Sequence, residues 1–193
     1  MRRLGGLLLA GFLAIAAAAP AAAHPHVWVE SRVVLVEDQG RLAVELEWSF
    51  DRDFSDFVLT RFKKGKGIGF SDAEQLEIRR KAFSNLKEYN YFVSARWDGG
   101  EVQEFAGETA FHAWVQGDIV VYRFRLPLAD PPRPDARLSI AVYDPEYFVA
   151  IAPSPRDPVL SRTARLACAL TTAQPVSTPW GDIHPPTTAC QRG

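Results

Sequence analysis

The chain carries, close to its start, residues whose donor atoms suit a metal ion. His24 and His26 lie two residues apart, directly after a run of small residues that ends at Ala23. Cleavage after Ala23 makes His24 the first residue of the mature chain, where its free α-amine and its imidazole chelate one ion. An extended backbone returns His26 to the same face. The sequence therefore predicts a site with three nitrogen donors.

Pro25, between the two histidines, restricts the coordination geometry. Proline has no amide hydrogen to lose, so a square-planar form with deprotonated backbone amides is blocked. The remaining nitrogen donors suit nickel, cobalt, zinc or copper as a divalent ion. We expect further ligands from His112, Asp51 or Asp144, with His184 as another candidate. The simpler alternative is that the two histidines only begin a strand and dock on it by hydrogen bonds.

The first 23 residues have the pattern of a secretory signal peptide. Arg2 and Arg3 precede an apolar run over residues 4–19, and Ala21 and Ala23 supply the small residues of a cleavage site. The apolar run is short for a permanent membrane span, which requires about 20 apolar residues. We therefore predict a cleaved signal and a periplasmic protein that is soluble after cleavage, with an uncleaved anchor as the alternative.

The charge balance argues against a nucleic-acid partner. The signal removes two of the 22 basic residues and none of the 23 acidic residues. The mature chain is thus slightly acidic, whereas electrostatic binding to nucleic acid requires a basic excess or a basic stripe.

Cys168 and Cys190 are the two cysteines of the chain. In an exported protein such a pair most simply forms one disulfide. We expect it to staple a C-terminal tail over residues 161–193, whose prolines leave little strand or helix pattern, after a β-rich domain over residues 24–160. A redox or thiolate-metal pair is the alternative, although the chain lacks a C-x-x-C spacing.

Strand patterns dominate the rest of the chain. Alternating apolar residues joined by short turns predict one hairpin near the mature N-terminus and two more further on. The predicted pairs are 26–36 with 41–49, 91–97 with 101–105, and 110–115 with 119–126. Two later strands are expected over residues 138–143 and 147–151. This spacing favours an antiparallel β-sandwich or an open barrel.

A helical insertion interrupts these strands at about residues 51–90. Apolar residues take helical spacing after Asp51, and a glycine- and lysine-rich stretch over residues 63–69 then breaks regular structure. Ser71 and Glu74 have the spacing of a capping box and predict a second helix that ends near Asn90. The fold class is thus mainly β, of the α+β kind.

Four motifs that occur in order resemble the bacterial domain-of-unknown-function family 1007. The resemblance runs from His24 to about Ala150. The motifs are His24-Pro25-His26-Val27-Trp28-Val29, Phe50-Asp51-x-x-Phe54-Ser55, Asn85-Leu86-x-x-Tyr89-x-Tyr91-Phe92 and Tyr143-Asp144-Pro145-x-Tyr147-Phe148-Val149-Ala150.

The resemblance implies a periplasmic component of an uncharacterised transport system for nickel, cobalt or zinc, working with an inner-membrane metal permease. Many members of that family carry a calcium loop of the form D-x-D-x-D-G-x-L-S-x-x-E. Here Lys63, Gly65 and Gly67 fall at its first three ligand positions. These residues offer no carboxylate, so we expect no calcium site.

Two functions of different kinds remain open, and a third is simpler than both. The first is a non-enzymatic metal-binding protein that serves a permease, which the resemblance favours. The second is a copper oxygenase of the histidine-brace type, which requires His112 or His184 to approach the N-terminal histidine from a distant strand. The third is a metal-free scaffold that contacts a partner through its exposed sheet or its insertion.

Overall fold

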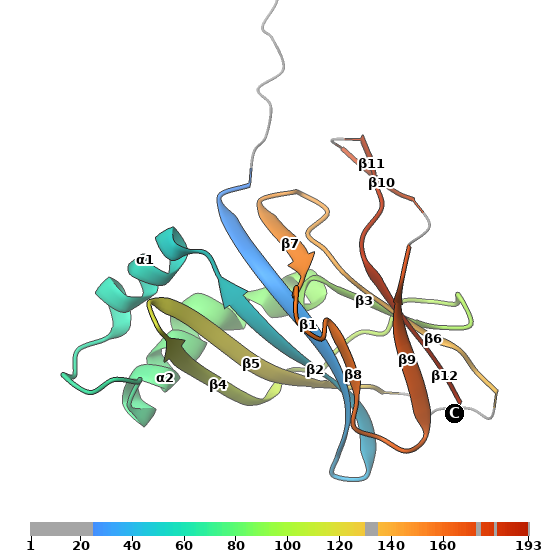
Figure 1. The fold of residues 1–193 in the computed structure, drawn as a ribbon, viewed down its shortest axis with the longest axis horizontal. Helices are drawn as coiled ribbons and strands as arrows, with labels where there is room; N and C mark the ends of the chain where they lie inside the picture. Colours follow the sequence, from blue (N-terminus) through green and yellow to red (C-terminus); the bar gives the residue numbers. More distant parts are fainter. Residues whose placement is uncertain (1–24, 130–134, 173–174, 180, 193) are drawn as a thin grey trace, which may run out of the picture.

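The structure is a computed structural model that describes residues 25–129, 135–172, 175–179 and 181–192. Strands dominate it, and they form two larger sheets and one short ribbon (Figure 1). The strands are β1 (Val27–Asp38), β2 (Arg41–Phe50), β3 (Val93–Trp97), β4 (Thr109–Gln116), β5 (Ile119–Pro127), β6 (Leu138–Val142), β7 (Val149–Pro153), β8 (Val159–Ser161), β9 (Leu166–Thr171), β10 (Val176–Thr178), β11 (Gly181–Ile183) and β12 (Thr187–Arg192). The helical segments are α1 (Arg52–Phe62), α2 (Asp72–Ile78), a π-helical turn (Arg79–Phe83) and a 3₁₀ segment (Ser84–Phe92).

Strands β1 and β2 form the predicted N-terminal hairpin. They pair antiparallel from Val29 opposite Phe50 to Asp38 opposite Arg41. The intervening residues Gln39 and Gly40 have φ of 49° and 78°. Positive φ at both central residues gives a two-residue turn the twist that matches the paired strands. The predicted hairpin of β4 and β5 is confirmed in the same way.

The first sheet has the order β4-β5-β2-β1-β7, and β8 also pairs with β1. β7 and β8 run parallel to β1, with Val27 opposite Val149 and Val33 opposite Val159. The predicted mainly β fold with a helical insertion is confirmed. The antiparallel arrangement holds for the hairpins but not for these two late strands, and the described strands do not close into a barrel.

The second sheet, of order β3-β6-β12-β9, corrects two expectations. The predicted strand over residues 101–105 does not form, because β3 pairs with β6 and only Val102 makes an isolated bridge back to Arg96. The C-terminal tail, in contrast, forms strands of its own. Cys168 and Cys190 lie directly opposite each other on β9 and β12 and form the predicted disulfide.

Each of the two α-helices in the insertion begins at a side-chain cap. Asp51 accepts a hydrogen bond from the Phe54 N–H and caps α1, and Ser71 and Glu74 form the predicted capping box at the start of α2. The second helix is shorter than expected. Regular α-helix ends at Ile78, and the chain reaches Phe92 through the π-helical turn and the 3₁₀ segment.

The main core lies between the inner face of the first sheet, the helical insertion and the second sheet. Trp48, Phe83 and Phe124 are at its centre, each at most 2% exposed. The Trp48 ring packs edge-on against Phe124 at 5.0 Å, and its Nε1–H donates to the Ser31 hydroxyl at 3.1 Å. Leu166 and Cys190 of the tail belong to the same core.

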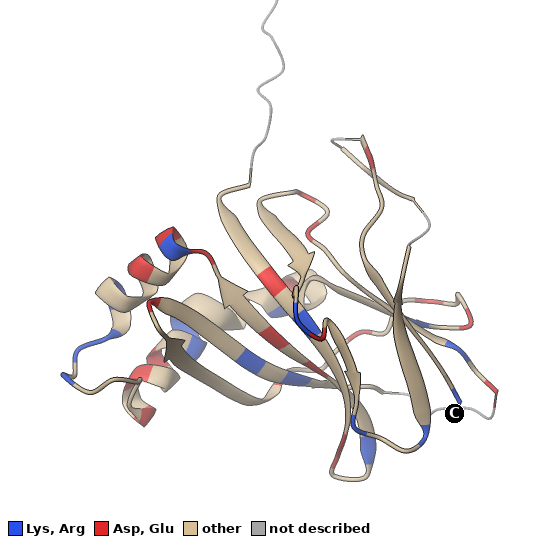
Figure 2. Cartoon of the chain, in the orientation of Figure 1, with Lys and Arg blue, Asp and Glu red and all other residues tan. Residues whose placement is uncertain are grey.

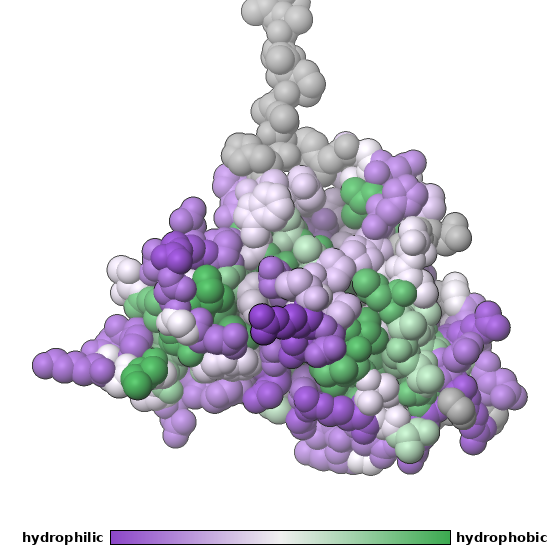
Figure 3. All heavy atoms as spheres, viewed as in Figure 1, coloured by the Kyte–Doolittle hydropathy of each residue, from purple (hydrophilic) through white to green (hydrophobic). Residues whose placement is uncertain are grey.

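The outer face of the first sheet is polar. Figure 2 shows acidic residues on β1 and β2 and basic residues on β5, and ion pairs join Arg32 to Glu47 at 3.1 Å and Arg125 to Glu45 at 2.7 Å. Figure 3 shows hydrophilic residues over most of this side, with apolar patches on the helical side and near β8 and β9. Within the described ranges, no helix is both long and apolar enough to cross a membrane.

Candidate functional site

His26 is fixed at the start of β1 by the turn that precedes β7. Its backbone N–H donates to the Phe148 carbonyl at 2.9 Å. Its ring lies 4.7 Å from the Phe148 ring, centroid to centroid, with a tilt of 33°. The residue is exposed, so its imidazole is presented at the edge of the fold. His24, the other predicted N-terminal ligand, lies outside the described residues.

The two predicted carboxylate ligands are occupied by backbone N–H groups. Asp51 accepts from Trp28 at 2.6 Å through Oδ2 and from Phe54 at 2.8 Å through Oδ1. It therefore joins the start of β1 to the start of α1. A metal ion at Asp51 would have to displace one of these bonds.

Asp144 has a similar structural task in the turn before β7. Its Oδ1 accepts from the Glu146 N–H at 2.9 Å, and its Oδ2 accepts from the Phe148 and Val149 N–H groups at 3.0 Å each. The residue is only 5% exposed. These bonds close the turn that carries Phe148 to His26.

The remaining histidines lie away from His26. His112 is on β4, and β2 and β5 separate that strand from β1. Neighbouring strands are about 4.8 Å apart, so three such steps place β4 roughly 14 Å from β1. The His112 ring stacks on Trp114 at 5.7 Å instead. His184 is exposed just beyond β11. The described residues hold no group of three or more His, Cys, Asp or Glu side chains arranged for a metal.

A cavity of about 400 Å³ lies beside the Phe148 turn, between the first sheet and the 3₁₀ segment. Its walls are mostly aromatic and aliphatic, and Glu146 contributes an exposed carboxylate. That carboxylate makes no side-chain hydrogen bond or ion pair with the described part of the chain. All four sequence motifs contribute to the lining, through Val27, through Phe50 and Phe54, through Leu86, Tyr89 and Phe92, and through Asp144, Phe148 and Val149.

Rare backbone conformations surround this cavity. Asn90, Tyr91 and Phe92 have φ between 49° and 58°, and Tyr147 has φ of 57°. Left-handed backbone at residues other than glycine is strained and concentrates at functional sites. The π-helical turn, which supplies Ala82 to the lining, is also a feature found often at such sites. The left-handed backbone places Phe92 over the cavity. Its ring stacks on the Trp48 ring, with 6.4 Å between the ring centroids.

Partly buried hydrogen bonds hold the left-handed segment in place. The Asn90 side chain donates to the carbonyls of Val93 and Gln103, both at 2.9 Å, and accepts from the Phe105 N–H at 3.1 Å. The Tyr91 hydroxyl donates to Glu108 at 2.7 Å. Burial raises the pKa of Tyr91, and its bond to Glu108 raises the pKa further. The segment is therefore held in place at two of its residues, Asn90 and Tyr91.

Glu108 completes this lock. Burial alone would raise the pKa of Glu108, but hydrogen bonds from Tyr91 and Arg79 outweigh burial and leave the pKa below its ordinary value. The Arg79 Nε–H lies 2.6 Å from the carboxylate. Arg79 begins the π-helical turn, so the same network joins both rare backbone segments.

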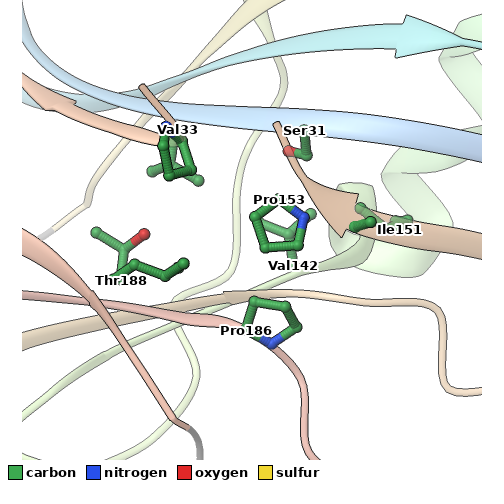
Figure 4. Close-up of a pocket in the computed structure, with 10 residues that line it drawn as sticks. Ser31, Val33, Val142, Ile151, Pro153, Pro186 and Thr188 are labelled. Atoms are coloured by element: carbon green, nitrogen blue, oxygen red, sulfur yellow. The ribbon is translucent and has the colours of Figure 1, made fainter. Parts of the chain in front are cut away.

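A second hollow, between β1, β7 and the second sheet, is too small for a ligand. Figure 4 shows Val33, Ile151, Val142 and Pro186 facing one another across it. Its volume of about 20 Å³ is roughly that of a single water molecule's probe space. Of these two, only the aromatic cavity has room for a ligand.

Sequence reasoning missed this cavity, although it found the motifs that build it. The motif residues are spread from Val27 to Val149, and their spacing in the sequence does not indicate that they line one cavity. The cap at Asp51 had a readable signal, because an aspartate directly before helical spacing is a favoured N-cap. The left-handed run at 90–92 had none, since tyrosine and phenylalanine rarely adopt it.

The fold and the site define a mainly β protein of two sheets, with an aromatic cavity beside the first residues of β1. The chain belongs to the family described as "Protein of unknown function (DUF1007)", whose model matches residues 9–180. It is also similar to an "Uncharacterized 15.5 kDa protein in trpE 3'region" from Spirochaeta aurantia, with 34% identity over 92 residues, or 47% of this chain. The match covers 64% of that relative.

Among solved structures, the chain shows a weak likeness to the acetylcholine-binding protein type 1 of Biomphalaria glabrata. The TM-score is 0.36 at 12% identity, over 89% of this chain and 88% of that one.

Proposed function

We propose that this is an exported protein, periplasmic after signal cleavage, that binds a divalent transition metal at its mature N-terminus and serves an inner-membrane metal permease. The metal is nickel, cobalt, zinc or copper, and its first ligands are the His24 α-amine, the His24 imidazole and the His26 imidazole. The protein is a carrier in this proposal and not an enzyme.

The observation that carries the proposal is the fixed position of His26. The Phe148 carbonyl and ring hold this residue on the sheet, two positions after His24, the predicted first residue of the mature chain. The amine and imidazole of His24 are only two residues from His26, so binding has to order only two residues to bring them to the His26 imidazole. Binding therefore requires little additional loss of chain entropy.

Glu146 is the best-placed additional donor in the turn that holds His26. Its carboxylate makes no side-chain hydrogen bond among the described residues, whereas those of Asp51 and Asp144 are occupied by backbone N–H groups. We therefore favour Glu146 over the two aspartates as a carboxylate ligand.

The position of His112 favours the carrier over the copper oxygenase. A histidine brace requires a distant histidine opposite the N-terminal one, and two strands separate the strand of His112 from β1. His184 lies beyond β11, outside the first sheet. Formation of peroxide by the copper-loaded protein with a reductant would support the oxygenase instead.

The test compares protein with its processed N-terminus and protein that keeps a methionine before His24. Trp28 lies two residues after His26 in the chain and is 56% exposed, so bound Cu(II) will quench its fluorescence. An extension converts the amine to an amide, which is a poor donor, and should weaken binding strongly. The Trp28→Phe variant shows how much of the fluorescence quenching comes from Trp28, which lies beside the site.

His26→Ala and His112→Ala form a matched pair, because both residues are exposed histidines on the first sheet. Loss of an outer-shell partner lowers metal affinity by roughly 10–100-fold, so loss of a direct ligand at His26 should lower it at least as much. His112→Ala should leave affinity unchanged. Equal affinity of the processed and extended proteins would refute the N-terminal site, and absence of binding by both would favour the metal-free scaffold.

The aromatic cavity supports a second function, binding of a small apolar ligand that carries a cationic or hydrogen-bond-donating group toward Glu146. The convergence of four motifs and three rare backbone segments on one cavity favours it. Ala82→Phe would fill the cavity and should abolish binding of an apolar fluorescent probe. Leu76→Phe, at a position 54% exposed on α2, is the control. Equal probe binding by both variants would contradict a ligand site.

A further inference from the structure

The loop between α1 and α2 wraps around the ammonium group of Lys63. Lys63 Nζ donates to the Gly65 carbonyl at 3.0 Å and to the Gly69 carbonyl at 3.0 Å, and it also donates to the Gly67 carbonyl. All three carbonyls thus converge on one atom. An ammonium has three hydrogens to donate, and here each has an acceptor.

The three carbonyls come from alternate residues, which is the pattern of a cation-binding loop. In a twelve-residue calcium loop, ligands come from positions 1, 3, 5, 7 and 12, and position 7 contributes its backbone carbonyl. With Lys63 as position 1, the carbonyls of Gly65, Gly67 and Gly69 stand at positions 3, 5 and 7. Glu74 stands at position 12.

Both carboxylate oxygens of Glu74 accept hydrogen bonds from the loop itself. Its Oε1 accepts from the N–H groups of Lys64 and Gly65, at 2.5 and 2.8 Å. Its Oε2 accepts from the Ser71 N–H at 2.7 Å and from the Ser71 hydroxyl at 2.9 Å. The carboxylate therefore ties the beginning of the loop to the start of α2, while the ammonium gathers the middle of the loop.

We infer that residues 63–74 form a cation-binding loop whose cation is the chain's own Lys63 ammonium. The tethered ammonium takes the central position of a hard cation and closes the loop without any dissolved ion. The join between α1 and α2 is then independent of the calcium concentration around the protein.

An ordinary helix-end lysine would behave differently. Lys63 is the C-cap of α1, and its backbone N–H bonds to the Leu59 carbonyl. A lysine near a helix end can donate hydrogen bonds to the last carbonyls of its own helix. Among the described residues, the Lys63 ammonium instead bonds to carbonyls of the following loop, which is the expected behaviour of a loop cation.

The first test compares Lys63→Met with Lys66→Met. Lys66 lies in the same loop, is exposed, and has no side-chain hydrogen bond or ion pair in the described part of the chain. Lys63→Met leaves three carbonyls without their charged donor and should lower the melting temperature by roughly 3–6 °C. Lys66→Met should change it by no more than about 1 °C. Equal melting temperatures would overturn the inference.

The second test converts the loop to a metal site. Lys63→Asp with Gly67→Asp removes the ammonium and supplies carboxylates at positions 1 and 5, and a side chain at Gly67 meets no atom within 4 Å. Lys66→Asp with Gly67→Asp makes the same change in charge but keeps the ammonium.

Calcium at millimolar concentration should raise the melting temperature of the Lys63 double variant by several degrees and leave the Lys66 double variant and the unmodified protein unchanged. A calcium response in the unmodified protein, or the same response in both double variants, would overturn the inference. So would a Lys63 double variant that folds but does not respond.

Discussion

Asp144 offers the sharpest test of how the candidate site is built, because the sequence predicts a metal ligand and the structure shows a turn brace. Asp144→Ala removes the acceptor of three backbone N–H groups, those of Glu146, Phe148 and Val149. Hydrogen bonds to a charged group contribute about 1.5–3 kcal/mol each. Water can reach part of this turn, since Glu146 and Phe148 are exposed.

We therefore expect a total loss of about 3 kcal/mol, which is below the sum of three independent bonds because such bonds in one turn are not additive. For a chain of this size, 1 kcal/mol shifts the melting temperature by roughly 2–4 °C, so the expected fall is about 6–12 °C. Asp144→Asn keeps one carbonyl acceptor and should fall between this variant and the unmodified protein. Glu146→Ala should stay within about 0.5 kcal/mol.

The assay pairs urea unfolding, followed by far-UV circular dichroism, with Cu(II) quenching of Trp28. If Asp144 braces the turn, the Asp144→Ala protein is less stable than the unmodified protein. Its metal affinity then falls only to the extent that Phe148 no longer holds His26 in place. A ligand gives the opposite pattern. An Asp144→Ala variant that keeps its stability but loses most of its metal affinity would refute our interpretation of the turn.

Three further predictions concern protons and the disulfide. Imidazoles ordinarily titrate near about 6.5 and α-amines near about 7.7–8.0, so metal affinity should fall steeply from pH 8 to 5 with more than one proton released per metal. Calorimetry in buffers of different ionisation enthalpy counts the released protons. A count near zero at pH 7 would contradict the amine-imidazole site. Hydrogen bonds from the Ser71, Gly65 and Lys64 N–H groups lower the pKa of Glu74 to about 2. Because the folded pKa is below the unfolded one, the stabilisation is present above about pH 4.5 and is lost as the pH falls toward 2; Glu74→Gln should flatten urea midpoints over this range, and parallel curves for the two proteins would show that Glu74 does not contribute. Replacing both cysteines by serine opens a link between residues 22 positions apart and should cost about 3 kcal/mol in urea unfolding, whereas an unchanged midpoint would mean that the strand pairing alone holds the tail.

Local patterns in the sequence predicted the local elements well. The turn at Gln39-Gly40, the capping box of Ser71 and Glu74, and the cysteine pair each depend on residues whose chemistry acts over a few positions or has one possible partner. Alternation of apolar residues identified both confirmed hairpins, because the inner face of each strand must be buried.

Long-range pairing was beyond that reasoning. Alternation in residues 147–151 says which face is buried, but not that the strand lies parallel to β1. The prolines of the tail predict irregular structure, yet Pro175, Pro179, Pro185 and Pro186 all fall outside the paired stretches of β9 and β12. At Tyr91 and Phe92, buried contacts override the backbone preference of aromatic residues, so only the folded environment explains their left-handed conformation.

The parallel pairing of β1 with β7 has a consequence for the order of assembly. Residues 27–31 are made early, and their partners at 149–153 are made after most of the chain. Contacts this far apart in sequence form slowly, because a long loop must close before they stabilise anything. The nascent chain can form the β1–β2 hairpin at once, but β1 keeps one edge unpaired until residues 149–161 have been made. The carbonyl of Phe148 that orders His26 is equally late, so in a chain still emerging from the ribosome the residues around His26 are without their anchor.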